Sequence, residues 1–593
     1  MWGRSSAASF AFLAIAFLTA FTGSASAQIE APKDRDSPKD RDAPKERDVK
    51  EAVAVAPLGQ TDPWSVGWLG KADGALASTI WSGTDTTTLA QIMSDLQPAS
   101  LSPAARQALR RIMLSSARGP KDGANLIPER LRLIELVGET DHAIDLRKRF
   151  PATEWGKGAE RLASDYELAA GRSQTACARA ADKAPDQQAW MPVRALCYAI
   201  AGDLNAAGGI SEHTQGADGQ VDTWLIAALS TVGAAAKSKP PGRYDTPLSV
   251  AISILAKLSV PGDGIRATPP DIALAIVRHP DATLEQKRAA MRIAADAGRL
   301  TLADAFAILN APVDPPAAVS QRVAVRPKAD FLAMALTAAA DKGLGDEARA
   351  AAFAAAFKGA ETATDFHIAA IALRDQLKSL PRSDATQPSA EVFARAALTA
   401  GDLPLAIEWR KVMDRKAPPK SERAEKTDAS EALDLWPAAH LDLMLSFAGA
   451  PGEKPADILD RLLDAVPPAP DSTAKAATPA QRQAELRRIE NTRALFLYVG
   501  AGRALNPAAR SLLSTLRTAG RGVPDGALAR IQSALDASAY GEGALAAIAQ
   551  IGPDASAVSF AGLADLLAAL RSAGLEKDAN AIALEALQPW KAL

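Results

Sequence analysis

Residues 393–409 read Phe393-Ala-Arg-Ala-Ala-Leu-Thr-Ala-Gly401-Asp-Leu-Pro-Leu-Ala406-Ile-Glu-Trp409. This stretch predicts two helical segments joined at a glycine. Ala and Leu, which favour helices, stand on both sides of the glycine. Gly401 can adopt the left-handed conformation that ends a helix, and the small Ala406 lets the next helix approach closely. We therefore expect a helix–turn–helix hairpin, closed by Pro418.

The same pairing of a glycine with an alanine five residues later recurs along the chain. The other pairs are Gly138/Ala143, Gly171/Ala176, Gly202/Ala207, Gly298/Ala303, Gly345/Ala350 and Gly574/Ala579. The first two intervals between these glycines are 33 and 31 residues, and the third is 96, or three times 32. A fixed period of this length indicates an array of repeats.

This unit resembles the tetratricopeptide repeat, a helix–turn–helix of 34 residues. Gly401, Ala406 and Pro418 fall where that family keeps its turn Gly, helix-B Ala and terminal Pro. The same offsets separate Gly298, Ala303 and Pro315. Most of the family's helix-A Trp and Tyr residues are missing. The resemblance covers residues 125–420 and implies an α-solenoid of hairpins, and another irregular array of helical hairpins is the alternative.

Composition agrees with an all-α fold. The chain has 593 residues, more than one core usually supports, and about a fifth of them are Ala. Aromatic residues make up only 5%, and two Cys exclude a disulfide-rich scaffold. Lys and Arg number 67 against 69 Asp and Glu, which argues against a nucleic-acid-binding protein.

The N-terminus is typical of an exported protein. Arg4 is followed by an apolar run, Ala7–Phe21, and by the small-residue cleavage site Ala25-Ser-Ala27. We expect a mature chain that begins at Gln28, with an uncleaved anchor as the alternative. Because no Cys follows the site and no later apolar run reaches transmembrane length, we expect a soluble periplasmic protein.

Breaks in the periodic pattern divide the chain into five segments. They are a signal peptide (1–27), a disordered charged linker (28–60), a helical-repeat solenoid (61–465), a Pro/Ala linker (466–477) and a C-terminal helical unit that continues the array (478–593). The charged linker repeats Pro-Lys-Asp/Glu-Arg-Asp three times with a period of six. Proline at every sixth position forbids a regular helix, so this segment is a spacer or, alternatively, a binding arm.

Helix starts share one form, a capping residue followed by proline at the first helical position. The pairs are Asp62-Pro63, Ser102-Pro103, Thr268-Pro269, Thr478-Pro479 and Asn506-Pro507. Only Val319–Val325 alternates weakly, so we expect no sheet beyond a stray ladder there.

The two cysteines are placed symmetrically about residue 187, beside the turn Lys183-Ala-Pro-Asp186. Residues equidistant from the tip of an antiparallel hairpin face each other. In an oxidising compartment Cys177 and Cys197 would therefore form a disulfide. Two inert buried thiols are the alternative.

Catalytic and metal-binding motifs are nearly absent from the sequence. The five His are more than sixty residues apart and are best explained as solvated or satisfied surface side chains. Ser472-x-x-Lys475 lies in a linker, and Gly541-Glu-Gly543-x-x-Ala546 follows no strand, so neither carries a site. Trp64, Trp68 and Trp81 are expected to pack the core rather than to form a stacking platform. We expect no catalytic residue, cofactor or metal.

Two functions remain. The first is a non-catalytic periplasmic scaffold that binds a protein or peptide partner of the cell envelope. The second is a helical arm of a cell-wall-processing enzyme, since the chain is similar in compartment and helical content to lytic transglycosylases. Its C-terminal region lacks the Glu-Ser start and the Gly-Leu-Met-Gln run that this second resemblance implies.

Overall fold

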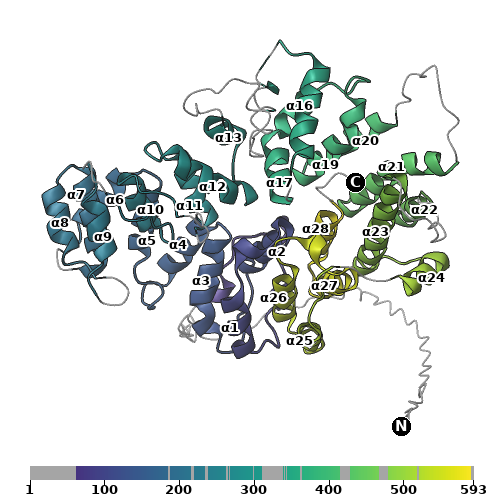
Figure 1. Ribbon diagram of the computed structural model, residues 1–593. Coiled ribbons are helices and arrows are strands. Elements are labelled where there is room, and N and C mark those ends of the chain that lie inside the picture. The colour runs from purple at the N-terminus through teal and green to yellow at the C-terminus, as the bar shows by residue number, and fades with distance from the viewer. Residues whose placement is uncertain are drawn as a thin grey trace, which may run out of the picture. The chain divides into compact units, whose positions relative to one another are not determined.

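Helices account for the regular structure of the chain. The computed structural model describes residues 62–184, 187–215, 220–233, 238–261, 265, 268–297, 299–309, 335, 338–339, 341, 343–360, 363–414, 428–465, 479–516 and 520–588. Within these ranges the β-structure consists of two isolated bridges, Gln215 with Val221 and Arg521 with Val558. The all-α prediction is thus confirmed for the described residues (Figure 1).

The helices are given in chain order with the labels of Figure 1. The first group is α1 (Thr86–Asp95), α2 (Pro103–Leu114), α3 (Ile127–Leu136), α4 (Thr140–Arg149), α5 (Ala159–Ala169), α6 (Ser173–Ala181), α7 (Met191–Ile200), α8 (Leu204–Ser211), α9 (Thr223–Leu229), α10 (Pro247–Leu255), α11 (Pro270–Arg278), α12 (Leu284–Asp296) and α13 (Leu302–Leu309). The second is α16 (Asp346–Lys358), α17 (Ala363–Ala372), α18 (Arg374–Ser379), α19 (Ala390–Thr399), α20 (Leu403–Met413), α21 (Asp428–Phe447), α22 (Pro455–Asp464), α23 (Pro479–Gly500), α24 (Pro507–Thr515), α25 (Asp525–Asp536), α26 (Tyr540–Ile551), α27 (Phe560–Ser572) and α28 (Glu576–Ala586). Short 3₁₀ turns are η1 (Pro63–Ser65), η2 (Pro98–Ser100), η3 (Gly123–Leu126), η4 (Gln188–Trp190), η5 (Gln387–Ser389) and η6 (Ala555–Ala557).

In five pairs of the glycine–alanine pattern, a left-handed glycine ends the first helix of the hairpin. Their φ angles are 85° at Gly138, 74° at Gly171, 86° at Gly202, 71° at Gly401 and 80° at Gly574. In each hairpin the following N–H donates to the carbonyl five residues earlier, as Asp402 does to Ala397 over 2.8 Å. This hydrogen bond satisfies a carbonyl that the helix end would otherwise leave unpaired. The five glycines therefore occupy the turn conformation that the sequence pattern requires.

The alanines five residues later are buried where the two helices of each hairpin meet. Ala143, Ala176, Ala207, Ala406 and Ala579 are all at most 1% exposed. A methyl group at this position lets the backbones approach, while a larger side chain would force the helices apart. In these hairpins the left-handed glycine thus forms the turn, and the buried alanine lies in the contact between the two helices.

Two members of the pattern differ from expectation. Gly345 has a φ of −66° and precedes α16 as an extended N-cap, although Ala350 is buried. Ala303 is exposed, because α13 turns this residue outward and buries Ile308 instead. The expected packing role of Ala303 is therefore wrong.

The structure also contains a hairpin that the glycine pattern misses. Ser538, between α25 and α26, has a φ of 59°, and Gly543 lies five residues later in the buried part of α26. Ala539 N–H donates to the Ala534 carbonyl over 2.8 Å, as in the glycine turns. A serine in the turn position and a glycine in the alanine position hide this unit from a search for Gly and Ala.

Proline-associated caps are confirmed at two sites and corrected at two. Ser102 and Asn506 accept the N–H groups of Ala105 and Ala509, and α2 and α24 follow them. Asp62 caps only the 3₁₀ turn η1, so no α-helix places Trp64 and Trp68 on one face. Thr268 instead donates its hydroxyl to the Tyr244 carbonyl, and α11 starts one residue later than expected.

Several predictions concern residues outside the described ranges. They are the signal peptide (1–27), the charged linker (28–60), the Pro/Ala linker (466–477), Pro185, Gly298, Pro315, Val319–Val325, Pro418, Ser472, Lys475 and Thr478. The compact unit that holds the described helices extends from Gln60 to Leu593.

The N-terminal helices α1 and α2 pack directly on the C-terminal helices α26 and α28 (Figure 1). Ser102 N–H donates to the Gly552 carbonyl over 2.6 Å, and Arg111 pairs with Asp578 at 2.5 Å. In an array where each repeat contacts only its neighbours, residues so distant in sequence would not meet. The contact buries the apolar faces that the two terminal hairpins would otherwise expose.

Buried apolar side chains form two separate clusters. The larger one includes residues from both terminal parts of the chain, such as Leu109 and Ile582. The smaller one is built from α5 to α10 and includes Leu196 and Leu225. Helices α6 to α9 therefore share a core that is distinct from the larger cluster, and α10 contributes to both.

Candidate functional site

The two cysteines lie opposite each other on α6 and α7. Cys177 Sγ and Cys197 Sγ are 2.01 Å apart, and the Cα atoms are separated by 5.6 Å. The pair is at disulfide distance, as its symmetry about residue 187 predicts. The closure joins two helices of the smaller core and fixes their spacing.

An apolar groove of about 510 Å³ opens beside this disulfide. We call it the disulfide groove. Its walls come from α6, α7 and α8, and they include Ala181, Met191, Tyr198 and Ile210 together with both cysteines. The alanines and Met191 supply apolar contact surface, while the disulfide holds the two helices that carry them at a fixed spacing.

The cations at the edge of the disulfide groove are already engaged. Arg194 donates to the carbonyls of Ala180, Lys183 and Ala184 and so caps the C-terminus of α6. Lys183 Nζ lies 2.5 Å from Glu160 and 5.4 Å from the centre of the Trp190 ring. Since these charges are paired within the protein, the groove favours apolar contacts over anion binding.

Large apolar side chains are exposed on the same helices. Tyr198 is 43% exposed, while Ile200 and Leu204 are each 41% exposed. Tyr198 also lines the disulfide groove. An exposed tyrosine in the wall of an apolar groove is typical of a protein-binding surface.

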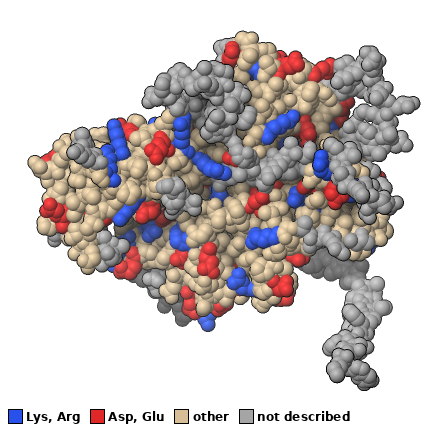
Figure 2. All heavy atoms as spheres, in the orientation of Figure 1, with Lys and Arg blue, Asp and Glu red and all other residues tan. Residues whose placement is uncertain are grey.

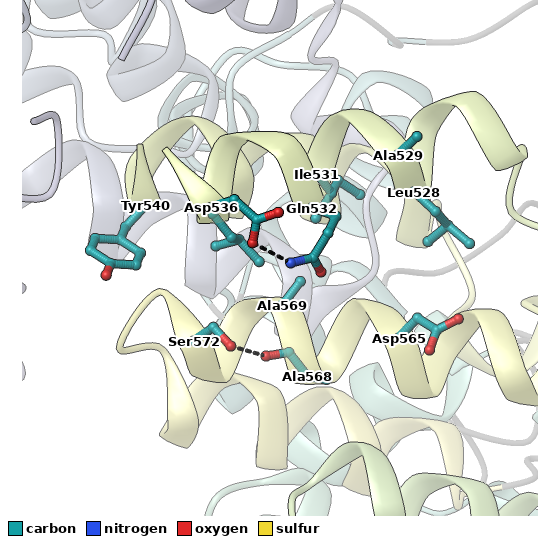
Figure 3. Close-up of a pocket in the computed structure, with 11 residues that line it drawn as sticks. Leu528, Ala529, Ile531, Gln532, Asp536, Tyr540, Asp565, Ala568, Ala569 and Ser572 are labelled. Carbon is teal, nitrogen blue, oxygen red and sulfur yellow. Dashed lines mark hydrogen bonds between the residues drawn. The ribbon is translucent and has the colours of Figure 1, made fainter. Parts of the chain in front are cut away.

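A second groove, of about 760 Å³, lies between α25 and α27. We call it the acidic groove (Figure 3). Ile531 and Ala569 contribute to its apolar lining, and Asp536 and Asp565 are the charged residues that line it. Gln532 donates to Asp536 over 2.7 Å. Removal from water raises the pKa of the Asp565 carboxyl.

His440 is buried in the interior, which corrects the expectation of a surface histidine. It is 3% exposed and stacks on Trp436 with ring centres 4.5 Å apart. Its Nε2 atom has no hydrogen-bond partner. Burial, together with the nearby charges of Arg395 and Arg493, lowers the pKa of His440 to about 3. The imidazole is therefore neutral at physiological pH.

Charged side chains from α19 and α23 surround this histidine. Arg493 binds both carboxylate oxygens of Glu490 at 2.7 Å. Burial raises the pKa of Glu490 in spite of the positive charges of Arg493 and Arg395. Arg395 also lies within reach of Glu391, 3.8 Å away. Each ion pair lies within one helix, Glu391 with Arg395 on α19 and Glu490 with Arg493 on α23, so the pairs offset charge near His440 without joining the helices.

The N-terminal tryptophans pack the core. Trp64 and Trp81 are each 2% exposed and meet edge to face with ring centres 5.1 Å apart. Trp64 Nε1 donates to the Gly123 carbonyl over 2.9 Å. Trp68 donates to Asp145 and lies against the His142 ring. The core interpretation of Trp64 and Trp81 is confirmed.

The glycine-containing motif at residues 541–546 is structural. Gly541 lies at the start of α26, where an added Cβ would come within 2.5 Å of the Trp81 ring. The Glu542 carboxylate accepts the Asp85 N–H over 3.2 Å. Both residues therefore attach α26 to the N-terminal segment.

Comparisons with known proteins leave the family open. No protein-family model, curated protein or solved structure matches the chain. In the described ranges no three His, Cys, Asp or Glu residues come together as metal ligands. Within the same ranges, no helix has the length and apolarity needed to cross a membrane.

Charges of both signs are mixed on the face of the molecule that Figure 2 shows. In the face shown in Figure 2, Lys and Arg alternate with Asp and Glu. This distribution agrees with the near-zero net charge of −2. A surface that binds nucleic acid would concentrate cations in one patch or stripe.

Proposed function

We propose that the protein is an exported scaffold of tetratricopeptide-like hairpins that binds an apolar segment of a protein partner in the cell envelope. The observation that carries this proposal is the apolar disulfide groove with the exposed side chain of Tyr198 in its lining. Partner binding would remove these apolar surfaces from water, which is the main favourable contribution to most protein associations.

The disulfide supports both the place and the mode of action. A cysteine pair at bonding distance is typical of proteins that fold in an oxidising compartment such as the periplasm. Because the bond restrains α6 against α7, the groove keeps its shape before a partner arrives. Such pre-organisation reduces the entropy that binding must overcome.

Site-specific crosslinking tests this function. A photoreactive phenylalanine replaces Tyr198 in the full chain, which is produced with its own N-terminus in bacterial cells and irradiated there. We expect one dominant crosslinked envelope protein, identified by mass spectrometry. The crosslink should be lost when Ile210→Glu is added, because Ile210 lines the groove. It should persist with Leu435→Glu, since Leu435 is 65% exposed and lies outside the groove lining.

Two results would count against the proposal. The first is a crosslinked product that is unchanged by Ile210→Glu, because the partner would then not use the apolar groove. The second is release of soluble fragments from purified peptidoglycan by the mature protein, which would favour the alternative of a cell-wall-processing enzyme.

A further inference from the structure

The disulfide between α6 and α7 can be reached from the disulfide groove. Cys177 and Cys197 are both among the residues that line the groove, and both are half-buried. They pack against the smaller core without being enclosed in it, whereas the neighbouring Ala176 and Ala180 are at most 1% exposed. A thiol must reach a sulfur atom before it can exchange with a disulfide. The groove supplies this access while the hairpin stays folded.

The charge of the groove lining favours a thiolate at Cys197. Lys183 and Arg194 are its charged residues, and there is no acidic residue among the described residues that line it. Arg194 precedes Cys197 by three residues on α7, so the two side chains leave the same face of the helix. The guanidinium keeps its positive charge although it donates to backbone carbonyls. A nearby cation stabilises a thiolate and so makes its sulfur a better leaving group.

Contacts other than the disulfide hold α6 against α7. Arg194 donates to the Ala180 carbonyl over 3.1 Å and to the Lys183 carbonyl over 2.7 Å. Ala176 and Leu196 are buried in the core that the two helices share. We therefore expect the hairpin to stay folded when the S–S bond opens. The opening removes the covalent restraint on the spacing of the two groove walls.

We propose that the Cys177–Cys197 disulfide exchanges with a dithiol that enters the disulfide groove, and that this reduction switches the groove from a partner-binding to a non-binding state. A thiolate of the dithiol attacks Cys177 Sγ, the S–S bond breaks, and the electron pair leaves on Cys197 Sγ, which takes up a proton. The second thiol of the dithiol then attacks the mixed disulfide and releases the Cys177 thiol. The protein gains two electrons and two protons, and the dithiol becomes a disulfide. The effect on binding rests on the proposed scaffold function, whereas the exchange itself does not.

Reduction of the purified mature chain tests the access to the disulfide. Dithiothreitol is added with and without concentrated urea, and the free thiols are alkylated and counted by mass spectrometry at successive times. We expect the rate for the folded chain to lie within about tenfold of the rate in urea, because the sulfur atoms are accessible in the groove. Circular dichroism should show that the reduced chain keeps its helix content. Reduction that occurs only in urea overturns the proposal.

The site of attack tests the role of Arg194. Glutathione, which has one thiol, is used at limiting concentration so that the reaction stops at the mixed disulfide, and iodoacetamide traps the released thiol. We expect glutathione on Cys177 in the wild type and in Arg194→Lys, which retains the charge, but on both cysteines in Arg194→Gln. Arg179→Gln is the control, because it removes a cation from α6 at a position outside the groove lining. Glutathione on Cys197 in the wild type, or an unchanged preference in Arg194→Gln, would show that the assigned leaving group is wrong.

The source of the dithiol is tested with a protein and a small molecule. Reduced thioredoxin and dithiothreitol are compared on the folded chain at equal dithiol concentration. Faster reduction by thioredoxin assigns the reaction to a protein dithiol, and equal or slower reduction assigns it to a small one. Failure of both reagents overturns the proposal.

Crosslinking at Tyr198 separates this inference from the proposed function. We expect the crosslink to be lost in cells treated with dithiothreitol and in Cys177→Ser, and a crosslink that persists in both overturns the switch. If the folded chain is reduced but no crosslink forms in untreated cells, the exchange stands and the scaffold function fails. If the crosslink forms but only unfolded chain is reduced, the scaffold function stands and the exchange fails.

Discussion

Replacing Gly500 by alanine should destabilise the packing of α23 against α27. Gly500 is the last residue of α23, and a Cβ atom built on it would lie 2.7 Å from Ala564 Cα and 2.8 Å from the Ala564 carbonyl oxygen. Both neighbours are backbone atoms, so they cannot turn away as a flexible side chain would. The clash must be relieved by movement of a helix.

The size of the effect follows from this geometry. Non-bonded carbon atoms prefer separations of about 3.5–4.0 Å, so α27 must move by about 1 Å. Overpacking of this kind costs about 1–3 kcal/mol in the free energy of unfolding. Helix propensity acts in the opposite direction, since alanine is favoured over glycine by up to about 1 kcal/mol in a helix. The sign of the change in the free energy of unfolding therefore shows whether the clash with Ala564 or the gain in helix propensity is larger.

Gly209→Ala is the matched control. Gly209 lies in α8, and a Cβ atom there would meet no other atom within 4 Å. We expect this variant to gain up to about 1 kcal/mol from helix propensity alone. Both substitutions exchange the same residue types within a helix, so the difference between them isolates the contact with Ala564.

Urea unfolding followed by circular dichroism measures global stability, and hydrogen exchange of the α27 amides measures the local effect. We expect a lower urea midpoint and faster α27 exchange for Gly500→Ala, with neither change for Gly209→Ala. The reasoning is refuted if Gly500→Ala is as stable as the wild type and leaves α27 exchange unchanged.

Three further perturbations test other contacts. Cys177→Ser should lower the free energy of unfolding of the oxidised protein by about 3 kcal/mol, which is the loop-entropy value for a disulfide that joins residues 20 apart. In thermal melts under reducing conditions, the variant and the wild type should have the same stability. Because the pKa of His440 is about 3 when folded and 6.5 when unfolded, stability falls as pH drops below 6.5. At pH 5 the free energy of unfolding is lower by about 2 kcal/mol. Phenylalanine does not titrate, so urea unfolding should show the stability of His440→Phe relative to the wild type rising by about 2 kcal/mol between pH 7.5 and pH 5. A double-mutant cycle on Arg111→Met and Asp578→Asn should give a coupling energy of about 1–2 kcal/mol, and additive effects would mean that the ion pair contributes nothing.

The sequence by itself determined the local units of this protein. Alanine content and cap patterns predicted helices, and the glycine pattern predicted the left-handed turns at Gly138, Gly171 and Gly401. The spacing of Cys177 and Cys197 about one turn predicted that they would meet. These predictions succeed because both partners of each interaction lie within one hairpin, where residue type and interval fix the geometry.

Only the tertiary structure decided which hairpins meet. The pairing of Arg111 with Asp578 joins residues 467 apart, and no periodic pattern encodes that distance. The acidic groove likewise depends on the separation of α25 and α27, and the burial of His440 depends on how α19, α21 and α23 converge. Such features arise where apolar faces of different helices pack on one another. The sequence pattern is compatible with many pairings of these faces, but only faces of complementary shape can pack closely in space.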